Sequence, residues 1–365
     1  MSARLHRPIL VMAGGTGGHV YPALAVARAL QAKSREVVWL GTHRGLESRV
    51  VPAAGIDIEW ISVKGLRRKG LAALLIAPFQ TGWALLQSLG VILRRRPAAV
   101  LGMGGFVSGP GGVAAWLTRR PLVIHEQNAA AGMTNRLLAR LARVVLQAFP
   151  GSFNSSVDAE TVGNPVREDI AAIPAPGARY GERSGPLRLL VLGGSQGALA
   201  LNRTVPAALA QIATDLRPIV RHQCGERTLD TAKQVYAEHG VDVDLLPFIE
   251  DMAAAYAWAD LVVCRAGALT VAELCAAGLP ALFVPYPAAV DDHQTANAGP
   301  MAAAGAARII QEADLTPELL AGLLREWLQS RAELQSRAEK ARSLAAPNSL
   351  HRITELCLEQ AGVAA

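Results

Sequence analysis

Residues 9–19 have the sequence ILVMAGGTGGH, and residues 189–197, LLVLGGSQG, repeat the same pattern. Each copy is an uncharged apolar run followed by Gly-Gly, a hydroxyl residue and another glycine that enters a helical pattern. A strand that ends in glycines before a helix exposes backbone N–H groups and the positive end of the helix dipole, which suits a phosphate. The repeat predicts two similar α/β domains that face one another across a cleft, and only the first copy continues to Gly18 and His19.

Length and composition restrict the class of protein. A chain of 365 residues, 51% hydrophobic and 18% charged, predicts two globular domains with their own cores. The net charge of +6 favours an acidic partner, namely a nucleic acid, a nucleotide or an anionic membrane surface. Aromatic residues make up only 5% and are not interleaved with a basic run, which argues against a nucleic acid. Four cysteines without CxxC spacing and the lack of a signal peptide predict reduced thiols in the cytoplasm.

Short apolar runs alternate with helical patterns along the chain, which predicts βαβ units and parallel sheets. The expected strands are 9–13, 37–41, 98–103, 121–125 and 144–148 in the first half, and 187–193, 218–223, 243–248, 260–264 and 280–285 in the second. The segment between them is rich in Pro, Gly and charge. It predicts a first domain over 1–163, a linker over 164–186 and a second domain over 187–365 that ends in helices from Thr316.

Residues 71–93 carry no charge and are numerous enough to cross a bilayer. Polar residues interrupt the stretch, and it is flanked by basic triplets at 67–69 and 94–96, so a transmembrane span is disfavoured. Its place between two strands of one sheet predicts a crossover helix. Apolar area flanked by Arg and Lys favours a helix that rests on an anionic lipid surface, and a buried helix with solvated ends is the alternative.

The first glycine loop does not fit two common nucleotide sites. Val20 stands where GxGxxG requires glycine, and the second strand ends in Leu-Gly-Thr-His without the acidic residue that would hold the ribose of NAD. Neither loop contains GxxxxGK[ST], which excludes a P-loop kinase. The loop instead delivers His19 to the carboxyl end of a strand, where open α/β sheets bind ligands, and a neutral imidazole there is a candidate general base.

Further polar groups follow other predicted strands. The stretch 102–112 has six glycines in eleven residues, which favours close backbone approach to a ligand over tight turns alone. Residues 125–128, His-Glu-Gln-Asn, stand at the end of the next strand and suit sugar hydroxyls. In the second half, 265–267 leads into a helix that starts near Ala268 and carries Glu273, which is placed to bind a diol. Residues 291–298 open a later helix with Gln294 and Asn297 on one face.

With these residues in place, the chain resembles the bacterial cell-wall glycosyltransferases that add N-acetylglucosamine to lipid-linked N-acetylmuramyl-pentapeptide. The resemblance spans nearly the whole chain and rests on motifs in their expected order: GGTGGHVYPALAVA (14–27), GMGGFVSGPGG (102–112), HEQNAAAG (125–132), VGNPVR (162–167), GGSQGA (193–198), RAGALTVAE (265–273) and DHQTANA (292–298). It implies a glycosyltransferase-B fold, two Rossmann-like domains with parallel sheets facing a central cleft. It further implies an inverting transfer with no metal and no cofactor.

The resemblance also implies residue roles. UDP-N-acetylglucosamine would be the donor, with the backbone of Ile249 on uracil, Glu273 on the ribose, Ser195 and the helix after Gly267 on the diphosphate, and Gln294 and Asn128 on the sugar. The full donor set is Thr16, Gly17, Gly18, Asn128, Arg167, Ser195, Ile249, Ala268, Leu269, Thr270, Val271, Ala272, Glu273 and Gln294. The acceptor set, which would face the second substrate's diphosphate, is Gly14, Gly15, Gly104, Gly105, Ser108 and Gln127. His19 is the expected base, with Glu126 as the alternative.

The acceptor implied is lipid I, the undecaprenyl-pyrophosphoryl-N-acetylmuramyl-pentapeptide, whose 4-hydroxyl would receive the sugar to give β-1,4-linked lipid II for peptidoglycan. The expected location is the cytoplasmic face of the inner membrane, peripherally bound, with the region 64–96 toward the lipid. A UDP-sugar 2-epimerase of the same fold class is the nearest alternative. A membrane-facing patch and the 102–112 glycine cluster favour the transferase.

Overall fold

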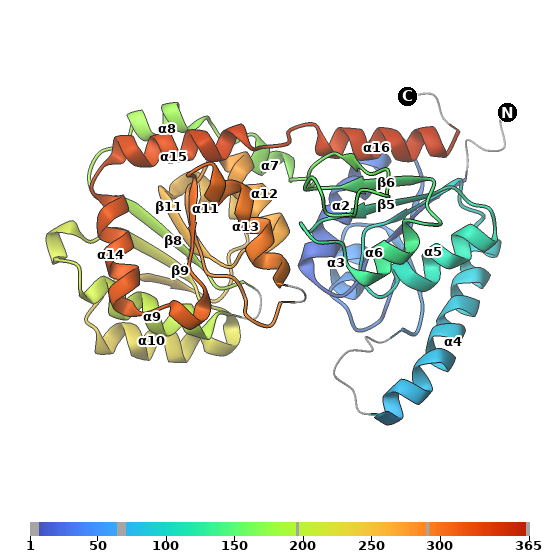
Figure 1. Ribbon diagram of the computed structural model, residues 1–365, viewed down its shortest axis with the longest axis horizontal. Helices are drawn as coiled ribbons and strands as arrows, with labels where there is room; N and C mark the ends of the chain where they lie inside the picture. The colour runs from blue at the N-terminus through green and yellow to red at the C-terminus, as the bar shows by residue number, and fades with distance from the viewer. Residues whose placement is uncertain (1–6, 64–70, 195–196, 290–291, 363–365) are drawn as a thin grey trace. The chain divides into compact units, whose positions relative to one another are not determined.

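The structure is a computed structural model that describes residues 7–63, 71–194, 197–289 and 292–362, and the backbone alone over 71–77. Its contacts divide the chain into two compact units (Figure 1). The first unit comprises Met1–Val166 and Ala346–Ala365, and the second unit comprises Arg167–Ala345.

The first unit is built on a parallel sheet in the order β3-β2-β1-β4-β5-β6-β7. Its strands are β1 (Ile9–Met12), β2 (Val37–Gly41), β3 (Asp57–Trp60), β4 (Ala99–Gly102), β5 (Leu122–Glu126), β6 (Val144–Gln147) and β7 (Glu160–Thr161). The order reverses between β1 and β4, where Met12 lies opposite Gly102. Open α/β sheets bind ligands at such a switch point, beyond the carboxyl ends of the strands.

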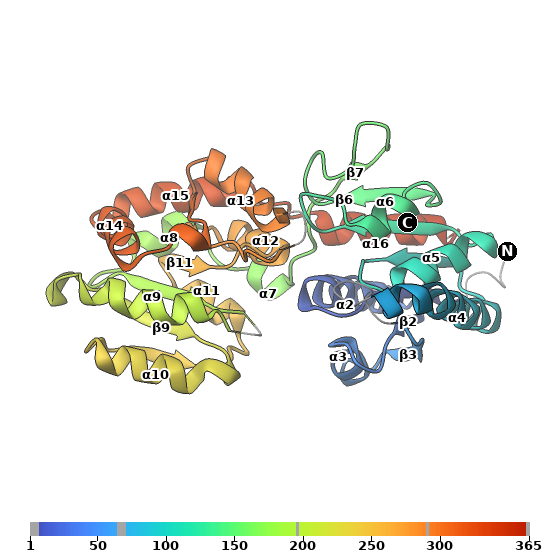
Figure 2. The ribbon, with the colours of Figure 1, turned by 60° about the horizontal axis from the view of Figure 1, so that its bottom comes forward.

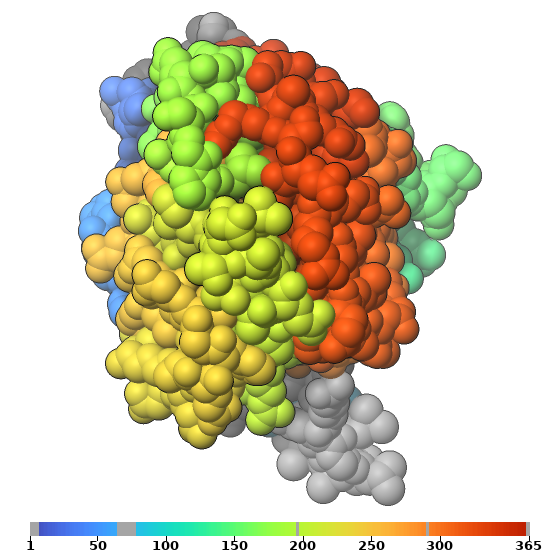
Figure 3. Space-filling view, turned by 90° about the vertical axis from the view of Figure 1, so that its left-hand side faces the viewer, coloured from blue at the N-terminus to red at the C-terminus, as the bar shows by residue number. Residues whose placement is uncertain are grey.

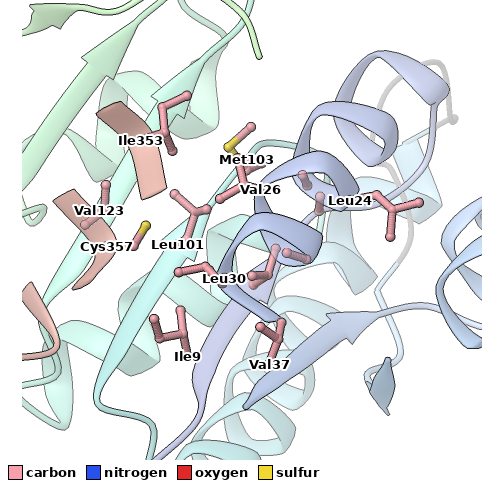
Figure 4. Packing of buried hydrophobic residues seen from close by; sticks show 14 of the residues in the cluster. Ile9, Leu24, Val26, Leu30, Val37, Leu101, Met103, Val123, Ile353 and Cys357 are labelled. Carbon is pink, nitrogen blue, oxygen red and sulfur yellow. The ribbon is translucent and has the colours of Figure 1, made fainter. Parts of the chain in front are cut away.

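Helices cover both faces of this sheet, namely α2 (Gly17–Ala32), α3 (Glu47–Ala53), α4 (Leu71–Arg95), α5 (Ser108–Leu117), α6 (Met133–Leu138) and α16 (Ser349–Gln360). Because side chains alternate along a strand, β1 contributes to two cores. Ile9 belongs to the core cluster that also contains Leu30 of α2 and Ile353 of α16 (Figure 4). Leu10 packs on the opposite face with Ile92 of α4. The sheet is therefore buried on both sides, as a parallel sheet requires.

The second unit repeats the plan with a parallel sheet in the order β10-β9-β8-β11-β12-β13. Its strands are β8 (Arg188–Leu192), β9 (Ile219–Gln223), β10 (Asp244–Leu246), β11 (Leu261–Cys264), β12 (Ala281–Phe283) and β13 (Ala307–Ile309). The switch point lies between β8 and β11, which are adjacent in the sheet. Both glycine loops of the sequence repeat therefore leave a strand at the switch point of its own unit.

The helices of the second unit are α7 (Glu168–Ala171), α8 (Pro176–Gly181), α9 (Leu199–Ala210), α10 (Leu229–Glu238), α11 (Met252–Trp258), α12 (Ala268–Ala277), α13 (His293–Ala303), α14 (Pro317–Leu328) and α15 (Arg331–Ser343). α9 and α10 lie beside one another, and α15 lies beside α8 and α12 (Figure 2). At the surface, α14 runs beside α9 and α15 beside α8 (Figure 3).

The sequence predicted ten strands, and all ten are present with bounds that differ by at most two residues. The domain boundaries differ from the prediction. The expected linker contains α7 and α8, which pack on α12 and α15 within the second unit. Arg179 of α8 is buried and donates to the carbonyl oxygens of Ala277 and Gly278. The final helix α16 packs on α2 and β4 of the first unit, so residues 187–365 do not form one compact unit.

The charge-free stretch forms α4, the crossover between β3 and β4. Its inner face is buried at Ala84, Ser88 and Ile92, whereas Phe79 and Trp83 are 80% and 59% exposed. The helix is therefore neither fully buried nor uniformly exposed. Within the residues that the structure describes, no helix combines the length and the apolar character needed to cross a membrane.

Candidate functional site

Two glycine-rich loops meet at the switch point of the first unit. The loop after β1 enters α2 at Gly17, and the loop after β4 leads toward α5. The loops touch closely, because a Cβ on Gly105 would lie 2.2 Å from the carbonyl oxygen of Gly14. Gly104 and Gly105 also have positive φ angles, 92° and 81°, which glycine adopts without strain. Packing of one loop on the other therefore accounts for some of the glycines in 102–112, which were predicted to allow close approach of a ligand.

His19 is the third residue of α2 and is half-buried beside the second loop. A Cβ on Gly104 would lie 2.5 Å from its Nδ1 atom, so glycine at 104 lets the ring lie against the backbone. The Nδ1 atom is 3.0 Å from Oε1 of Gln127, which follows β5. The fold thus brings together His19 and Gln127, two residues predicted for the site and separated by 108 positions.

Glu47 of α3 is a residue that the sequence analysis missed. Its carboxylate is fully buried and accepts hydrogen bonds from the Gly15 N–H at 2.9 Å, the Thr42 N–H at 3.0 Å and the Thr42 hydroxyl at 2.8 Å. The only signal in the sequence is an acidic residue shortly after the second strand. The Gly15 N–H, predicted to bind the acceptor's diphosphate, is already donated to a carboxylate.

Glu126, the alternative base, is held by its own loop. One carboxylate oxygen accepts from the backbone and side-chain nitrogens of Asn128 at 3.0 and 3.1 Å. The other accepts from the Gly132 N–H at 3.1 Å and from Asn135 Nδ2 at 2.9 Å. Glu126 is only 2% exposed, so its geometry is that of a carboxylate that fixes the loop between β5 and α6.

Ser108 is the first residue of α5. It is fully buried, and its hydroxyl lies 2.8 Å from the carbonyl oxygen of Gly104 and 3.2 Å from that of Met12. The hydroxyl ties α5 to the second loop and to β1. Acceptor binding by Ser108 stays a prediction.

The second unit carries the other copy of the glycine loop. Gly194 has a positive φ of 76°, like Gly15 in the first copy at 95°. Its N–H donates to Oε1 of Gln223 at 2.9 Å, and Gln223 Nε2 donates back to the Gly194 carbonyl oxygen. A neutral amide therefore occupies the place that the Glu47 carboxylate has in the first unit. Ser195 of this loop lies outside the described residues.

The loop after β11 leads into α12, which begins at Ala268 as predicted, with Gly267 as its N-cap. Ala268, Leu269 and Thr270 form the first turn, and the backbone N–H groups of a first turn point toward the N-terminal end of the helix. Because β8 and β11 are neighbours, this turn and the Gly193–Gly194 backbone flank the switch point of the second unit. Asn297 of α13 is buried and donates to the carbonyl oxygen of Ala266, which ties α13 to this loop.

Glu273 lies farther along α12 and is 7% exposed. Burial raises the pKa of its carboxyl group, and Arg167, 3.6 Å from Oε1, opposes that shift. The hydroxyl of Tyr256 on α11 donates to Oε2 at 2.9 Å. Tyr256 was not predicted, because only the fold brings α11 beside α12.

Four further predicted residues of the second unit lie on α12, on α13 or after β10. Val271 is buried and Ala272 is half-buried on α12. Ile249 follows β10 in the loop before α11. Gln294 on α13 is half-buried, and its Oε1 accepts from the Tyr286 N–H at 2.9 Å.

Comparison with known families gives two matches. The glycosyltransferase family 28 N-terminal domain matches residues 9–147, and the glycosyltransferase family 28 C-terminal domain matches residues 188–353. Together with the two parallel sheets, these matches confirm the predicted glycosyltransferase-B fold class.

Individual relatives agree with these matches. The UDP-N-acetylglucosamine–N-acetylmuramyl-(pentapeptide) pyrophosphoryl-undecaprenol N-acetylglucosamine transferase of Alkalilimnicola ehrlichii is 58% identical over 354 residues, which is 97% of this chain and 99% of its own. The crystal structure of MurG from Acinetobacter baumannii is 42% identical with a TM-score of 0.84, over 97% of this chain and 99% of that one. A UDP-N-acetylglucosamine 2-epimerase structure is 14% identical with a TM-score of 0.65, over 98% of this chain and 97% of that one, and shares the fold alone.

Proposed function

The chain belongs to glycosyltransferase family 28, and we propose that it transfers N-acetylglucosamine from UDP-N-acetylglucosamine to the 4-hydroxyl of the muramyl sugar of lipid I, giving β-1,4-linked lipid II for peptidoglycan synthesis. The observation that carries this proposal is the 58% identity to a transferase of that name over nearly the full length of both chains. The half-buried histidine at the first switch point and the buried glutamate at the second provide groups for the chemistry.

The reaction is a single in-line displacement with inversion at the anomeric carbon. The acceptor oxygen forms the new bond to that carbon while the bond to the UDP oxygen breaks, and UDP leaves with the electron pair. His19 takes the proton of the acceptor hydroxyl, which is worth about 10²- to 10⁴-fold in rate for a positioned general base. Glu126 is the weaker candidate, because its two oxygens already accept four hydrogen bonds.

The second unit holds the donor in this proposal. The first turn of α12 faces the diphosphate with backbone N–H groups and the positive end of a helix dipole, which stabilise the charge on departing UDP. Glu273 accepts hydrogen bonds from the ribose hydroxyls, and Arg167 and Tyr256 hold its carboxylate in place. Gln294 binds the sugar, and the backbone of Ile249 contacts the uracil.

The first unit binds the cytoplasmic face of the membrane peripherally in this proposal. Large apolar side chains are exposed on α4, on α5, which packs on α4, and on α6, which packs on α5: Phe79, Trp83, Leu86, Leu93, Trp116, Leu117, Met133 and Leu137. Such a concentration of exposed apolar groups is typical of an interaction surface, and a lipid acceptor calls for one. Arg94 and Arg95 at the end of α4 contribute less charge than the sequence predicts, because both are ion-paired with Glu59 of β3.

The epimerase alternative is supported by fold likeness alone, at 14% identity. A single experiment separates the two reactions. Purified protein is incubated with UDP-N-acetylglucosamine labelled in the sugar, with and without a short-chain lipid-linked N-acetylmuramyl-pentapeptide. The transferase releases UDP and labels the lipid only when the acceptor is present. Labelled UDP-sugar epimer formed without acceptor, or no acceptor-dependent release of UDP, contradicts the proposal.

A further inference from the structure

A chain of side-chain hydrogen bonds leads from the interior of the first unit to His19. It begins at the carbonyl oxygen of Gly163, passes through His125 and Gln127, and ends on the Nδ1 atom of His19. His125 is fully buried and Gln127 is 2% exposed, whereas His19 is half-buried. These hydrogen bonds therefore connect the buried carbonyl oxygen of Gly163 to His19, the residue of the three that a substrate can reach.

The first link fixes the protonation of His125. Its Nε2 atom lies 2.9 Å from the Gly163 carbonyl oxygen, which can only accept, so Nε2 carries a proton and donates it. Burial lowers the pKa of His125 to about 4, so the ring is neutral at physiological pH. A neutral ring protonated on Nε2 has a lone pair on Nδ1.

The second hydrogen bond fixes the orientation of the Gln127 side-chain amide. Its Nε2 atom lies 3.2 Å from Nδ1 of His125 and 3.2 Å from the carbonyl oxygen of His125. Both of these atoms accept, so they require the NH₂ group of the amide at this position. The amide oxygen Oε1 must then point the other way, toward His19.

The third link fixes His19. Oε1 of Gln127 can only accept, and it lies 3.0 Å from Nδ1 of His19, so Nδ1 carries the proton. The lone pair of the neutral ring is then on Nε2. Gly104 also lies against the Nδ1 side of the ring, since a Cβ there would lie 2.5 Å from Nδ1 and 2.8 Å from Cε1. The Nδ1 edge is enclosed by protein, and Nε2 is the nitrogen left for a substrate.

We propose that Gln127 and His125 are positioning residues that hold His19 in the tautomer with a proton on Nδ1 and a lone pair on Nε2. The inference deepens the proposed function and rests on it for the role of His19 as base. It replaces the predicted role of Gln127 in acceptor binding, because both ends of its amide are engaged within the protein. A general base needs its lone pair directed at the substrate proton, and a fixed tautomer supplies it without reorganisation.

The tautomer is measured directly by ¹⁵N NMR of the full-length protein labelled in its histidine rings. The two ring nitrogens of a neutral histidine differ strongly in chemical shift according to which carries the proton, and the His19 signals are identified by their loss in His19→Gln. The expected result for the unmodified protein is a proton on Nδ1 of His19 and on Nε2 of His125. A His19 ring protonated on Nε2 overturns the inference without any variant that perturbs the fold.

Gln127→Leu then tests the link. It removes the acceptor for Nδ1–H at nearly constant volume, so His19 is expected to populate both tautomers. The rate constant kcat is expected to fall about ten- to a hundredfold, by analogy with the loss found when the partner that orients a metal-bound histidine is removed. The dissociation constant for UDP-N-acetylglucosamine is expected to stay unchanged.

Gln147→Leu is the matched control, because Gln147 is also a buried glutamine at the end of a strand in the same sheet, hydrogen-bonded to Thr161. Gln147→Leu removes a buried side-chain amide, as Gln127→Leu does, and is expected to leave the NMR signals of His19 unchanged. If Gln127→Leu leaves both the spectrum and kcat unchanged, or if Gln147→Leu moves them equally, the inference is wrong. Failure of the proposed function is a separate result, since it shows as absent transfer by the unmodified protein while the tautomer is still read by NMR.

Discussion

Replacing Glu47 by glutamine tests whether a buried carboxylate holds the first glycine loop. The carboxylate accepts three hydrogen bonds, two on Oε1 from Thr42 and one on Oε2 from the Gly15 N–H. Glutamine has only one acceptor oxygen in its side chain. In either orientation, its NH₂ group therefore faces a backbone N–H group, and an NH₂ group cannot accept the hydrogen bond that this N–H donates. The orientation that keeps both bonds to Thr42 loses the bond to Gly15 and leaves two donors in contact.

The magnitude follows from these bonds. A hydrogen bond to a charged group contributes about 1.5–3 kcal/mol, and a neutral one about 0.5–1.5 kcal/mol. Losing the Gly15 bond and weakening the two Thr42 bonds therefore lowers the free energy of unfolding by about 3 kcal/mol. The measurement is urea-induced unfolding, with the midpoint shift multiplied by the denaturant slope, together with hydrogen exchange of the peptide that contains Gly15.

Glu36→Gln is the control, because Glu36 is exposed and its substitution is expected to change stability by less than about 0.5 kcal/mol. The Gly15 amide is expected to exchange faster in Glu47→Gln and at the normal rate in Glu36→Gln. Equal stability of the two variants, with no change in exchange at Gly15, would refute the reasoning that the carboxylate fixes this loop.

Three further outcomes are expected. His19→Ala lowers kcat for acceptor-dependent UDP release by about 10²- to 10⁴-fold while the donor dissociation constant stays the same, and a near-normal rate removes His19 as the base. Tyr256→Phe deletes the hydrogen bond to Glu273 and weakens donor binding about tenfold, equivalent to ~1.5 kcal/mol, by titration calorimetry with UDP; unchanged binding shows that the bond does not support the ribose contact. Phe79→Ala combined with Trp83→Ala reduces sedimentation with anionic vesicles at least about tenfold and spares activity on a soluble acceptor analogue, and undiminished sedimentation excludes α4 as the membrane contact.

The second unit offers matched controls for two of these variants. Tyr236→Phe removes a buried hydroxyl that contacts Nδ1 of His222 and is expected to leave UDP binding unchanged. Leu216→Ala removes a large apolar side chain that is 67% exposed and is expected to leave vesicle binding unchanged.

The fold was largely predictable because central parallel strands are continuous apolar runs. Within the described part of the chain, the strands missed were β3, β7 and β13, which lie at or near sheet edges. β3 has the sequence DIEW and is partly exposed, and its two acidic residues interrupt the apolar run by which a strand is recognised. β7 and β13 have only two and three residues, which is too short for a recognisable pattern. Edge strands lack the second buried face that makes a central strand recognisable.

The candidate site was predictable to the extent that it lies beside glycine loops. His19 was identified because it follows such a loop directly. Its partner Gln127 was identified as polar but given another role, because the direction of an amide depends on contacts with residues far away in sequence. Glu47 and Tyr256 were missed for the same reason, since their helices come beside the loops only when the sheets form.

The return of α16 to the first unit has a consequence for synthesis of the chain. Ile353 and Cys357 of α16 are buried against Leu101 and Val123 of the central strands. When residue 166 has been made, the part of the sheet that α16 later covers is therefore still exposed. At 5–20 residues per second, the ribosome needs roughly 10 to 40 s to add the second unit before α16 follows. The unit that is synthesised first is thus the last to be completed, and we expect the second unit to fold ahead of it.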